Sequence, residues 1–322
     1  MRQTIPTYID NFQLLQKKCR WKMNKKTKMI IASIYAMNRQ HFHINHFIEI
    51  ADTIKKEAGF FSPLKGETRY MIAATLDVNF AEPIDAVSLL FKSYKDLIQA
   101  KFKRGSYTYI AAAILLTSHN EEENKMAWIS QAKQMYDQMQ KGHRFLTSHE
   151  DYPLAVLLAS KDNKEVMERA ETFYQLLNKN GFRKGNNLQC TSHILALEKE
   201  HDVDTLVHQV IHVFDAFRRV RFKQKPMYYP IMGMLALLPP ESFQIEDIVK
   251  TYKSLKKVKD FKWEKDLNII LAASFFMKEE LSISALTETT LFTTLEAILQ
   301  VQQAVMISTV AAATISSSGA SD

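Results

Sequence analysis

Residues 109–116, YIAAAILL, open on an aromatic side chain and continue in Ala, Ile and Leu without a charge. Other segments follow the same scheme, in which one aromatic or polar residue precedes a dense apolar run. They are KMIIASIYAM (28–37), YMIAATL (70–76), YPLAVLLA (152–159), TSHILAL (191–197), YYPIMGMLALL (228–238) and LNIILAASFF (267–276). A helix that is apolar nearly all round must be buried. The pattern therefore predicts a set of inner helices at these positions.

Longer amphipathic segments separate the apolar runs. In residues 203–217 the apolar side chains recur at helical spacing, which predicts one buried face: Val203, Leu206, Val207, Val210, Phe214 and Phe217. These outer helices end alike, with an aromatic residue, a large apolar residue three positions on, and a Phe five or six positions beyond. Tyr94, Leu97 and Phe102 form one such set, and Phe60 and Phe145 take the place of Phe102 in two others.

The repeating units start at regular intervals of about 37 to 44 residues, the length of a helix pair in an α-solenoid. Their first residues are Asn24, Glu67, Ser106, Glu150, Asn187, Pro226 and Glu264. With only eight glycines and eight prolines in 322 residues, the composition favours helices over hairpin turns. We therefore predict an all-α protein, an α-solenoid-like array of about seven helical hairpins over residues 24–315. A globular helical bundle with coincidental spacing is the alternative.

The ends of the array are predicted to carry cap helices. At the N-terminus the cap lies within residues 1–23, over Tyr8 to Lys18, and at the C-terminus the uncharged stretch 297–315 forms the other, followed by a disordered tail over 316–322. The C-terminal stretch is as long as a membrane span, but its glutamines make it a weak one, so we expect no membrane partner. Six of the eight glycines fall at junctions after outer helices, where a left-handed residue is expected.

The cysteine content and the N-terminus favour a cytoplasmic protein. Cys19 and Cys190 are too few for a disulfide framework or a thiolate zinc site. The first ten residues lack the apolar core of a signal peptide.

Three segments resemble an uncharacterised bacterial family catalogued only as domain of unknown function 4003. They are EDYPLAVLLA (150–159), FKWEKDLN (261–268) and the Ala-rich end after Gln303. The resemblance extends over nearly the whole chain and implies a bacterial cytoplasmic helical protein. It transfers no catalytic residue.

The most basic stretch, RRVRFKQK (218–225), places five cations in eight positions: Arg218, Arg219, Arg221, Lys223 and Lys225. A comparable helix end carries Lys101, Lys103 and Arg104. Acidic residues such as Glu82, Asp85 and Asp202 gather at the opposite ends of the same helices. Acid at a helix start and base at its end is what the helix dipole favours. A dedicated anion site is the competing interpretation, because five cations exceed the need of one helix end.

Two groups of histidines have spacings that metal sites use. Asp204, His208, His212 and Asp215 fall on one side of a helix opposite its apolar stripe, a possible zinc or nickel set. Gln209 stands where a zinc hydrolase would need a Glu, so that hydrolytic route is disfavoured. We expect these side chains to be solvated surface residues. The second group, His41, His43 and His46, is expected to mark the turn between the first two repeat helices.

The sequence contains no dinucleotide fingerprint, phosphate-binding loop or nucleophile elbow. No catalytic residue and no cofactor site is therefore predicted. The leading hypothesis is a non-enzymatic helical repeat protein that binds a protein or peptide in the bacterial cytoplasm. Its alternatives are nucleic-acid binding along a basic edge and a metal-dependent enzyme with its site around His208 and His212. The net charge of +7 is compatible with each.

Overall fold

The computed structural model describes residues 3–118, 124–143, 145–159 and 163–283, with Leu295, Ile298, Leu299, Gln302, Val305 and Met306. Within these residues the chain forms helices and no strand, which confirms the all-α prediction. The chain divides into two compact units. The N-terminal unit consists mainly of residues 2–133 and 149–159, and the C-terminal unit mainly of residues 134–148 and 160–296.

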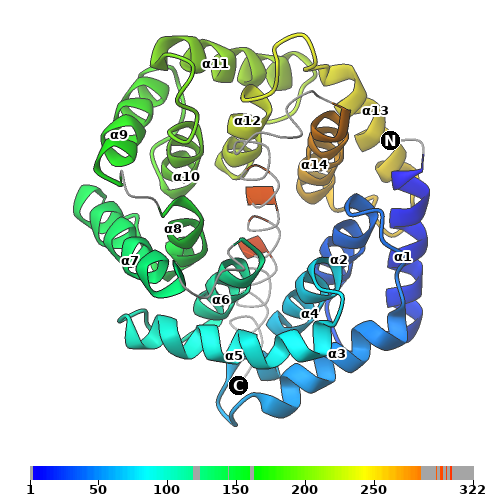
Figure 1. Ribbon diagram of the computed structural model, residues 1–322. Coiled ribbons are helices and arrows are strands. Elements are labelled where there is room, and N and C mark those ends of the chain that lie inside the picture. The colour runs from blue at the N-terminus through cyan, green and yellow to red at the C-terminus, as the bar shows by residue number, and fades with distance from the viewer. Residues whose placement is uncertain are drawn as a thin grey trace, which may run out of the picture. The chain divides into compact units, whose positions relative to one another are not determined.

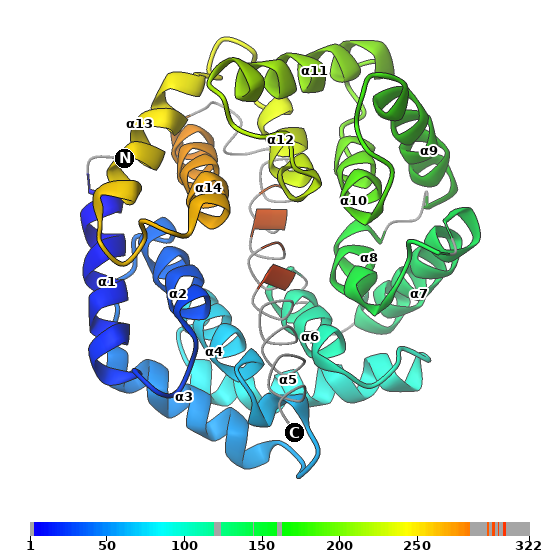
Figure 2. The same ribbon diagram turned by 180° about the vertical axis from the view of Figure 1, so that it is seen from behind.

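In the N-terminal unit, helices with fully buried surfaces lie side by side and amphipathic helices cover them. Helices α2, α4, α6 and α8 pack in succession, while α1 packs on α2, α3 on α4, and α5 on α6 (Figures 1 and 2). The bounds are α1 (Thr4–Lys18), α2 (Lys25–Met37), α3 (Ile44–Glu57), η1 (Pro63–Lys65), α4 (Thr68–Asn79), α5 (Pro83–Gln99), α6 (Ser106–Ser118), η3 (His149–Asp151) and α8 (Tyr152–Leu158).

The C-terminal unit follows the same scheme. Helices α10, α12 and α14 pack in succession, and α9, α11 and α13 pack on them in turn (Figures 1 and 2). The bounds are α9 (Asn163–Lys179), α10 (Asn186–Leu195), α11 (Val203–Arg219), η4 (Pro226–Tyr228), α12 (Tyr229–Ala236), α13 (Ile245–Lys257) and α14 (Lys265–Ile283). Helix α7 (Lys125–Gly142) begins in the N-terminal unit and ends in the C-terminal unit.

Each apolar run that opened the sequence argument lies in one of the buried helices. In α2 every side chain from Thr27 to Met37 is buried, and in α12 every side chain from Tyr229 to Ala236. The covering helices bury one stripe each. In α11 this stripe is Leu206, Val207, Val210, Val213, Ala216 and Phe217, close to the set that the sequence predicts.

The recurring Phe after an outer helix has a structural cause. In three connections its N–H bonds to the carbonyl five residues back, which belongs to the large apolar residue of the sequence pattern. These bonds are Phe102 to Leu97 (3.1 Å), Phe182 to Leu177 (3.1 Å) and Phe222 to Phe217 (3.0 Å). The residue before each Phe is left-handed, namely Lys101, Gly181 and Arg221. This is the Schellman arrangement, which ends the helix and turns the Phe into the core.

The expectation of left-handed glycines at these junctions is wrong at four positions. Gly59, Gly66, Gly105 and Gly142 are not left-handed, and Lys101 and Arg221 adopt that conformation instead. The hydrogen bonds of the Schellman arrangement offset the roughly 1–2 kcal/mol that it costs a residue with a Cβ. Phe60 and Phe145, unlike Phe102, are exposed. In the first case α3 ends on an extended Ala58, so the chain does not turn back as it does after α5.

Hydrogen bonds connect the starts of successive buried helices. Thr27 Oγ1 donates to Glu67 (2.6 Å), Tyr107 Oη to Glu150 (2.9 Å) and Tyr228 Oη to Asp266 (2.5 Å). The remaining tyrosines at these starts are buried among neighbouring hairpins: Tyr109, Tyr152 and Tyr229. Tyr152 and Tyr229 pack against Phe102 and Phe182 of the preceding connections.

The helix predicted at the N-terminus is present as α1. Only a few residues of the helix predicted over 297–315 are described, and the tail predicted over 316–322 lies outside the described residues. The single repeat domain over 24–315 stays a prediction. None of the described helices combines the length and the apolar character that crossing a membrane requires.

Candidate functional site: an aromatic cleft in the N-terminal unit

A cleft of ≈420 Å³ opens on the surface of the N-terminal unit, between the end of α3, the outer side of α5 and the start of α6. We call it the aromatic cleft. Its lining residues are Glu57, Gly59, Phe91, Tyr94, Lys95, Ile98, Gln99, Arg104 and Tyr109. The volume is in the range of sites that take a small molecule or a few side chains of a partner.

The helical hairpin α5–α6 builds the floor of this cleft. Phe91, Tyr94 and Ile98 are spaced by three and four residues, so they share one side of α5. The connection over residues 100–105 is short and returns Tyr109, in the first turn of α6, to that side. The rings of Tyr94 and Tyr109 stack with centroids 3.7 Å apart and planes at 6°, and Phe91 meets Tyr109 edge-on at 5.8 Å.

Burial raises the pKa of Tyr94, and the neighbouring Tyr109 adds to that effect. Both effects raise the pKa and so favour the neutral phenol. The hydroxyl of Tyr94 therefore keeps its proton throughout the physiological range and remains a hydrogen-bond donor on an otherwise apolar floor.

Charges of both signs surround this floor. Glu57, Lys95 and Arg104 are exposed, while Phe91 and Tyr94 are half-buried. The aromatic cleft can therefore hold an apolar or aromatic group and interact with charges beside it. Nothing in its lining resembles a nucleophile with a base at hydrogen-bond distance.

The five cations of residues 218–225 fall into two classes. Arg218 pairs with Asp215 (3.0 Å), and Lys225 pairs with Asp266 (2.6 Å), the carboxylate that also accepts from Tyr228. These two cations therefore each have an acidic partner. Arg219, Arg221 and Lys223 are exposed, and the last two lie beyond the end of α11 at Arg219.

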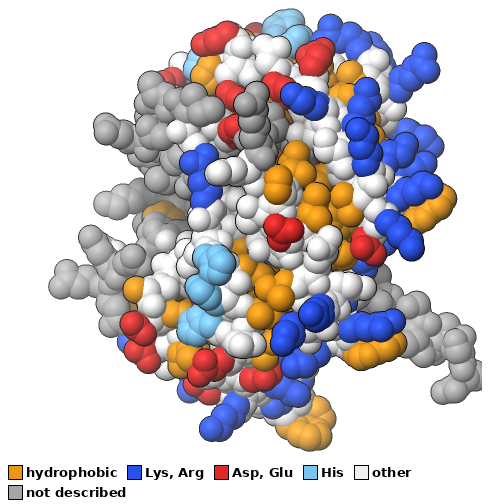
Figure 3. Space-filling model, turned by 90° about the vertical axis from the view of Figure 1, so that its right-hand side faces the viewer, with side chains coloured by type: hydrophobic (Ala, Val, Ile, Leu, Met, Phe, Trp, Pro, Cys, Tyr) orange, Lys and Arg blue, Asp and Glu red, His pale blue; other side chains and the backbone are white. Residues whose placement is uncertain are grey.

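The second basic group, Lys101, Lys103 and Arg104, is exposed in the α5–α6 connection. Lys101 and Arg221 occupy equivalent left-handed positions in their respective connections. Lys and Arg side chains are frequent on the surface in Figure 3, with hydrophobic side chains exposed among them. Whether these cations bind an anion stays a prediction.

The candidate metal ligands lie on the surface of α11. His208 and His212 are exposed, Asp204 is exposed, and Asp215 is half-buried and paired with Arg218. His212 also meets the ring of Phe243 edge-on at 5.9 Å. In the part of the chain that the structure describes, no three His, Cys, Asp or Glu side chains gather in a way that could hold a metal ion.

In the group of His41, His43 and His46, the first two lie between α2 and α3, as the sequence predicts. His41 and His43 are exposed and their rings meet at 4.4 Å. His46 lies in the first turn of α3, with its Nε2 3.7 Å from a carboxylate oxygen of Asp77.

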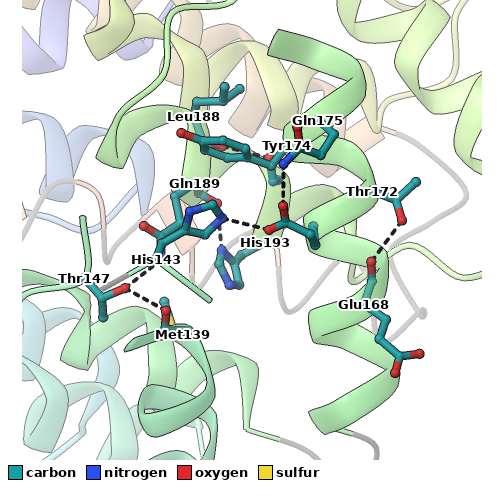
Figure 4. Close-up of polar contacts among 12 residues, drawn as sticks. Met139, His143, Thr147, Glu168, Thr172, Tyr174, Gln175, Leu188, Gln189 and His193 are labelled. Carbon is teal, nitrogen blue, oxygen red and sulfur yellow. Dashed lines mark hydrogen bonds and ion pairs between the residues drawn. The ribbon is translucent and has the colours of Figure 1, made fainter. Parts of the chain in front are cut away.

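A buried polar cluster in the C-terminal unit was not predicted from the sequence (Figure 4). His193 of α10 is 1% exposed, and its Nδ1 lies 2.7 Å from the carbonyl oxygen of Gln189, so Nδ1 must carry the proton. Its Nε2 has no hydrogen-bond partner among the described residues. Burial lowers the pKa of His193 to about 4.

Two side-chain contacts complete this cluster. Gln189 donates from Nε2 to Thr147 Oγ1 (2.9 Å), which donates to the carbonyl of Met139 (3.0 Å). Nearby, His143 Nε2 lies 2.8 Å from a carboxylate oxygen of Glu171, and its ring tilts against Tyr174. The cluster therefore holds a buried, neutral His193 near the contact between His143 and Glu171.

Sequence reasoning missed the aromatic cleft although it named several of its residues. Tyr94 belongs to the outer-helix signature, and Tyr109 opens the quoted run YIAAAILL. The usable signal is their combination, since an aromatic residue near the end of an outer helix and another in the first turn of the next helix face each other across a short connection.

Comparisons with known proteins agree with the sequence resemblance. A family described as "Protein of unknown function (DUF4003)" matches residues 11–304. "Uncharacterized protein YeaA" of Bacillus subtilis (strain 168) is 34% identical over 317 residues, which span 98% of this chain and 94% of that protein. No solved structure matches the chain.

Proposed function

The chain belongs to the DUF4003 family, as its resemblance in sequence indicated, and since that family is described without an activity we propose a function from the geometry of the chain itself. We propose that the protein is a non-enzymatic helical scaffold that binds a protein or peptide partner, and that the aromatic cleft is where it does so.

The observation that carries this proposal is the combination of an apolar floor with charges of both signs. Partner side chains that supply most of the binding energy are typically large and apolar, and they enter pockets surrounded by polar groups. Phe91, Tyr94 and Tyr109 offer such a floor, while Lys95 and Arg104 favour an acidic residue next to the anchor. A peptide with an apolar anchor beside a carboxylate fits both features.

The finer architecture belongs to the same proposal. Hydrogen bonds recur between successive buried helices within each unit, and this supports an α-solenoid-like array of about seven hairpins over residues 24–315. A cytoplasmic location in a bacterium is proposed with it. Small-angle scattering tests the array, because stacked hairpins give a larger radius of gyration than a globular bundle of equal length.

A random peptide display library, selected on the purified full-length chain, tests binding in the cleft. Enriched peptides should share an apolar or aromatic residue next to Asp or Glu. Gln99→Trp places a bulky ring in the cleft from an exposed position, and Leu89→Trp adds the same ring elsewhere on α5.

Gln99→Trp should lower the affinity for the selected peptides at least about tenfold, or about 1.4 kcal/mol, and Leu89→Trp should leave that affinity unchanged. Reversal of charge in Lys95→Glu should weaken the acidic peptides in particular. Selected peptides that bind both tryptophan variants as they bind the parent would contradict the proposal.

Nucleic-acid binding is the second candidate function. It is favoured by the exposure of Arg219, Arg221 and Lys223, of which the last two lie past the helix end and so exceed what the helix dipole explains. Nucleic-acid binding by these cations does not involve the aromatic cleft.

A further inference from the structure

The N-terminal unit gathers three connections at one end: α1–α2 over residues 19–24, α3–α4 over 58–67 and α5–α6 over 100–105. The first two are joined by a hydrogen bond from Asn24 Nδ2 to Glu67 (2.8 Å). The second reaches the first turn of α6, where Ser62 Oγ lies 3.4 Å from Tyr109 Oη. We call this end, with its three connections, the loop end.

Large aromatic side chains project from the loop end into solvent. Trp21 is 88% exposed, Phe60 85% and Phe61 95%, whereas Phe102 in the third connection is 2% exposed. The fold can therefore bury an aromatic residue at such a position and does not do so in the first two connections. Exposed apolar side chains that cluster on a surface mark contact with a partner or a membrane.

Cations surround these aromatic side chains. The sequence has no acidic residue between Asp10 and Glu49, and in that interval the α1–α2 connection and its flanks expose Lys17, Lys18, Arg20 and Lys22. The other two connections and the last turn of α3 contribute further exposed cations, namely Lys55, Lys56, Lys65, Lys101, Lys103 and Arg104, against the exposed acids Asp52 and Glu57. The loop end is thus strongly positive.

We propose that the loop end is a membrane-docking surface that binds anionic phospholipid headgroups through its cations and inserts Trp21, Phe60 and Phe61 into the interfacial layer. Amphipathic aromatic side chains favour the headgroup level of a bilayer, and clusters of Lys and Arg are attracted to anionic lipid. Such contact needs no membrane-spanning helix. The sequence argument against a membrane partner concerned only a spanning segment.

The ring contacts favour lipid over single-stranded nucleic acid. Base stacking needs an open aromatic face. The guanidinium of Arg20 lies 5.0 Å from the centroid of the Trp21 ring, over one face of the indole. Phe60 and Phe61 meet edge to face at 4.9 Å, so each ring supports the other. Rings held this way project into an apolar layer more readily than they accept a flat base.

This inference goes beyond the proposed function because it rests on Trp21, Phe60 and Phe61, none of which lines the aromatic cleft, although Arg104 belongs to both surfaces. The aromatic cleft would hold a peptide, while the loop end would hold the protein at the membrane where that peptide is met. Failure of either idea leaves the other standing, since Gln99→Trp alters only the cleft, and substitutions of Trp21, Phe60 and Phe61 alter only the projecting rings.

Co-sedimentation of the full-length chain with vesicles tests the proposal. The protein should bind vesicles of equimolar phosphatidylglycerol and phosphatidylcholine, and it should not bind vesicles of phosphatidylcholine alone. Binding should weaken as salt is added, because the cations are exposed. Absence of binding to the anionic vesicles even at low salt would overturn the proposal, and so would equal binding to both kinds.

Two variants separate the loop end from the rest of the unit. Replacement of Trp21, Phe60 and Phe61 together by Ser should reduce binding to the anionic vesicles at least about tenfold while the circular dichroism and melting curve stay those of the parent. The matched control replaces Leu89 and Met126, also exposed in this unit but outside the loop end, by Ser. That control should bind as the parent does, and an equal loss in both variants would refute the assignment to the loop end.

A charge variant and a competing probe complete the test. Lys22→Glu, Lys56→Glu and Lys103→Glu together should abolish binding to the anionic vesicles. Single-stranded oligouridylate should neither bind as tightly as these vesicles nor depend on the three aromatic side chains. Tighter binding of oligouridylate that is lost in the serine variant would assign the surface to nucleic acid and overturn the proposal.

Discussion

Replacement of His193 by Leu should make the protein more resistant to acid. His193 is fully buried in the C-terminal unit, and burial lowers its pKa from an ordinary 6.5 to about 4. Protonation would place a charge on Nε2, which has no acceptor among the described residues. The folded state therefore prefers the neutral ring, and acid must destabilise it relative to the unfolded chain.

The sign and size follow from the two pKa values. Because the folded pKa is the lower one, the contribution is present above about pH 6.5 and is lost as the pH falls toward about 4. The difference of roughly 2.5 pH units corresponds to about 3 kcal/mol, at 1.36 kcal/mol for each unit. About 2 kcal/mol of this is lost between about pH 7 and pH 5.

Urea unfolding at these two pH values, for the parent and for His193→Leu, measures this contribution. The difference between the two losses isolates the contribution of His193 together with its interactions with His143 and Glu171, which the substitution also removes. The parent should lose about 2 kcal/mol more than the variant on acidification. His208→Gln is the matched control, because His208 is exposed, and its loss should equal that of the parent. If the parent and His193→Leu lose the same free energy, the reasoning about a neutral buried ring is wrong.

Three further predictions concern packing, a half-buried carboxylate and the basic helix end. Gly233→Ala should lower the free energy of unfolding by about 1–3 kcal/mol, because its Cβ would lie 2.8 Å from Thr191 Cγ2. Gly105→Ala, which has open space around its Cβ, should change the free energy of unfolding little, and urea titration measures both variants. Asp266→Ala should lower the free energy of unfolding by about 1–3 kcal/mol, because Tyr228 and Lys225 lose their acceptor. Glu246→Ala, in the exposed first turn of α13, should lower it by at most about 1 kcal/mol, and equal losses of stability in the two melting curves would contradict this. Joint replacement of Arg219, Arg221 and Lys223 by Gln should leave the free energy of unfolding within about 1 kcal/mol of the parent's and should leave oligonucleotide affinity unchanged. If the plot of log affinity against log salt instead flattens by roughly 0.7–0.9 for each cation removed, the result would support nucleic-acid binding.

The buried helices could be predicted because the pattern that identifies each of them lies within one short stretch of sequence. A run such as YIAAAILL has no polar side to expose, so it forms a buried helix whatever lies beside it. The Tyr94, Leu97 and Phe102 pattern is local in the same way, since the hydrogen bond that explains it joins residues five positions apart. Tertiary contacts enter neither argument, and both therefore succeed from sequence.

The aromatic cleft and the His193 cluster could not be predicted for the opposite reason. Tyr94 and Tyr109 are fifteen positions apart and stack only because the α5–α6 connection has one particular geometry. His193 lies in the apolar run TSHILAL, and nothing in that run shows whether its ring meets solvent, a charge or the carbonyl of Gln189. Burial of a polar group depends on neighbours that are remote in sequence.

The junction after α3 shows how a departure from a repeated pattern can point to function. By sequence, Phe60 stands where Phe102 stands, but Phe102 is buried and Phe60 is not. The α3–α4 connection instead buries Leu64 in its short η1 helix, and it leaves Phe60 and Phe61 outside. Their rings therefore contribute little to the fold, although their exposure to water is unfavourable. An apolar pair that the fold has a way to bury, and that stands among exposed lysines, is explained more simply by contact with an anionic interface than by packing.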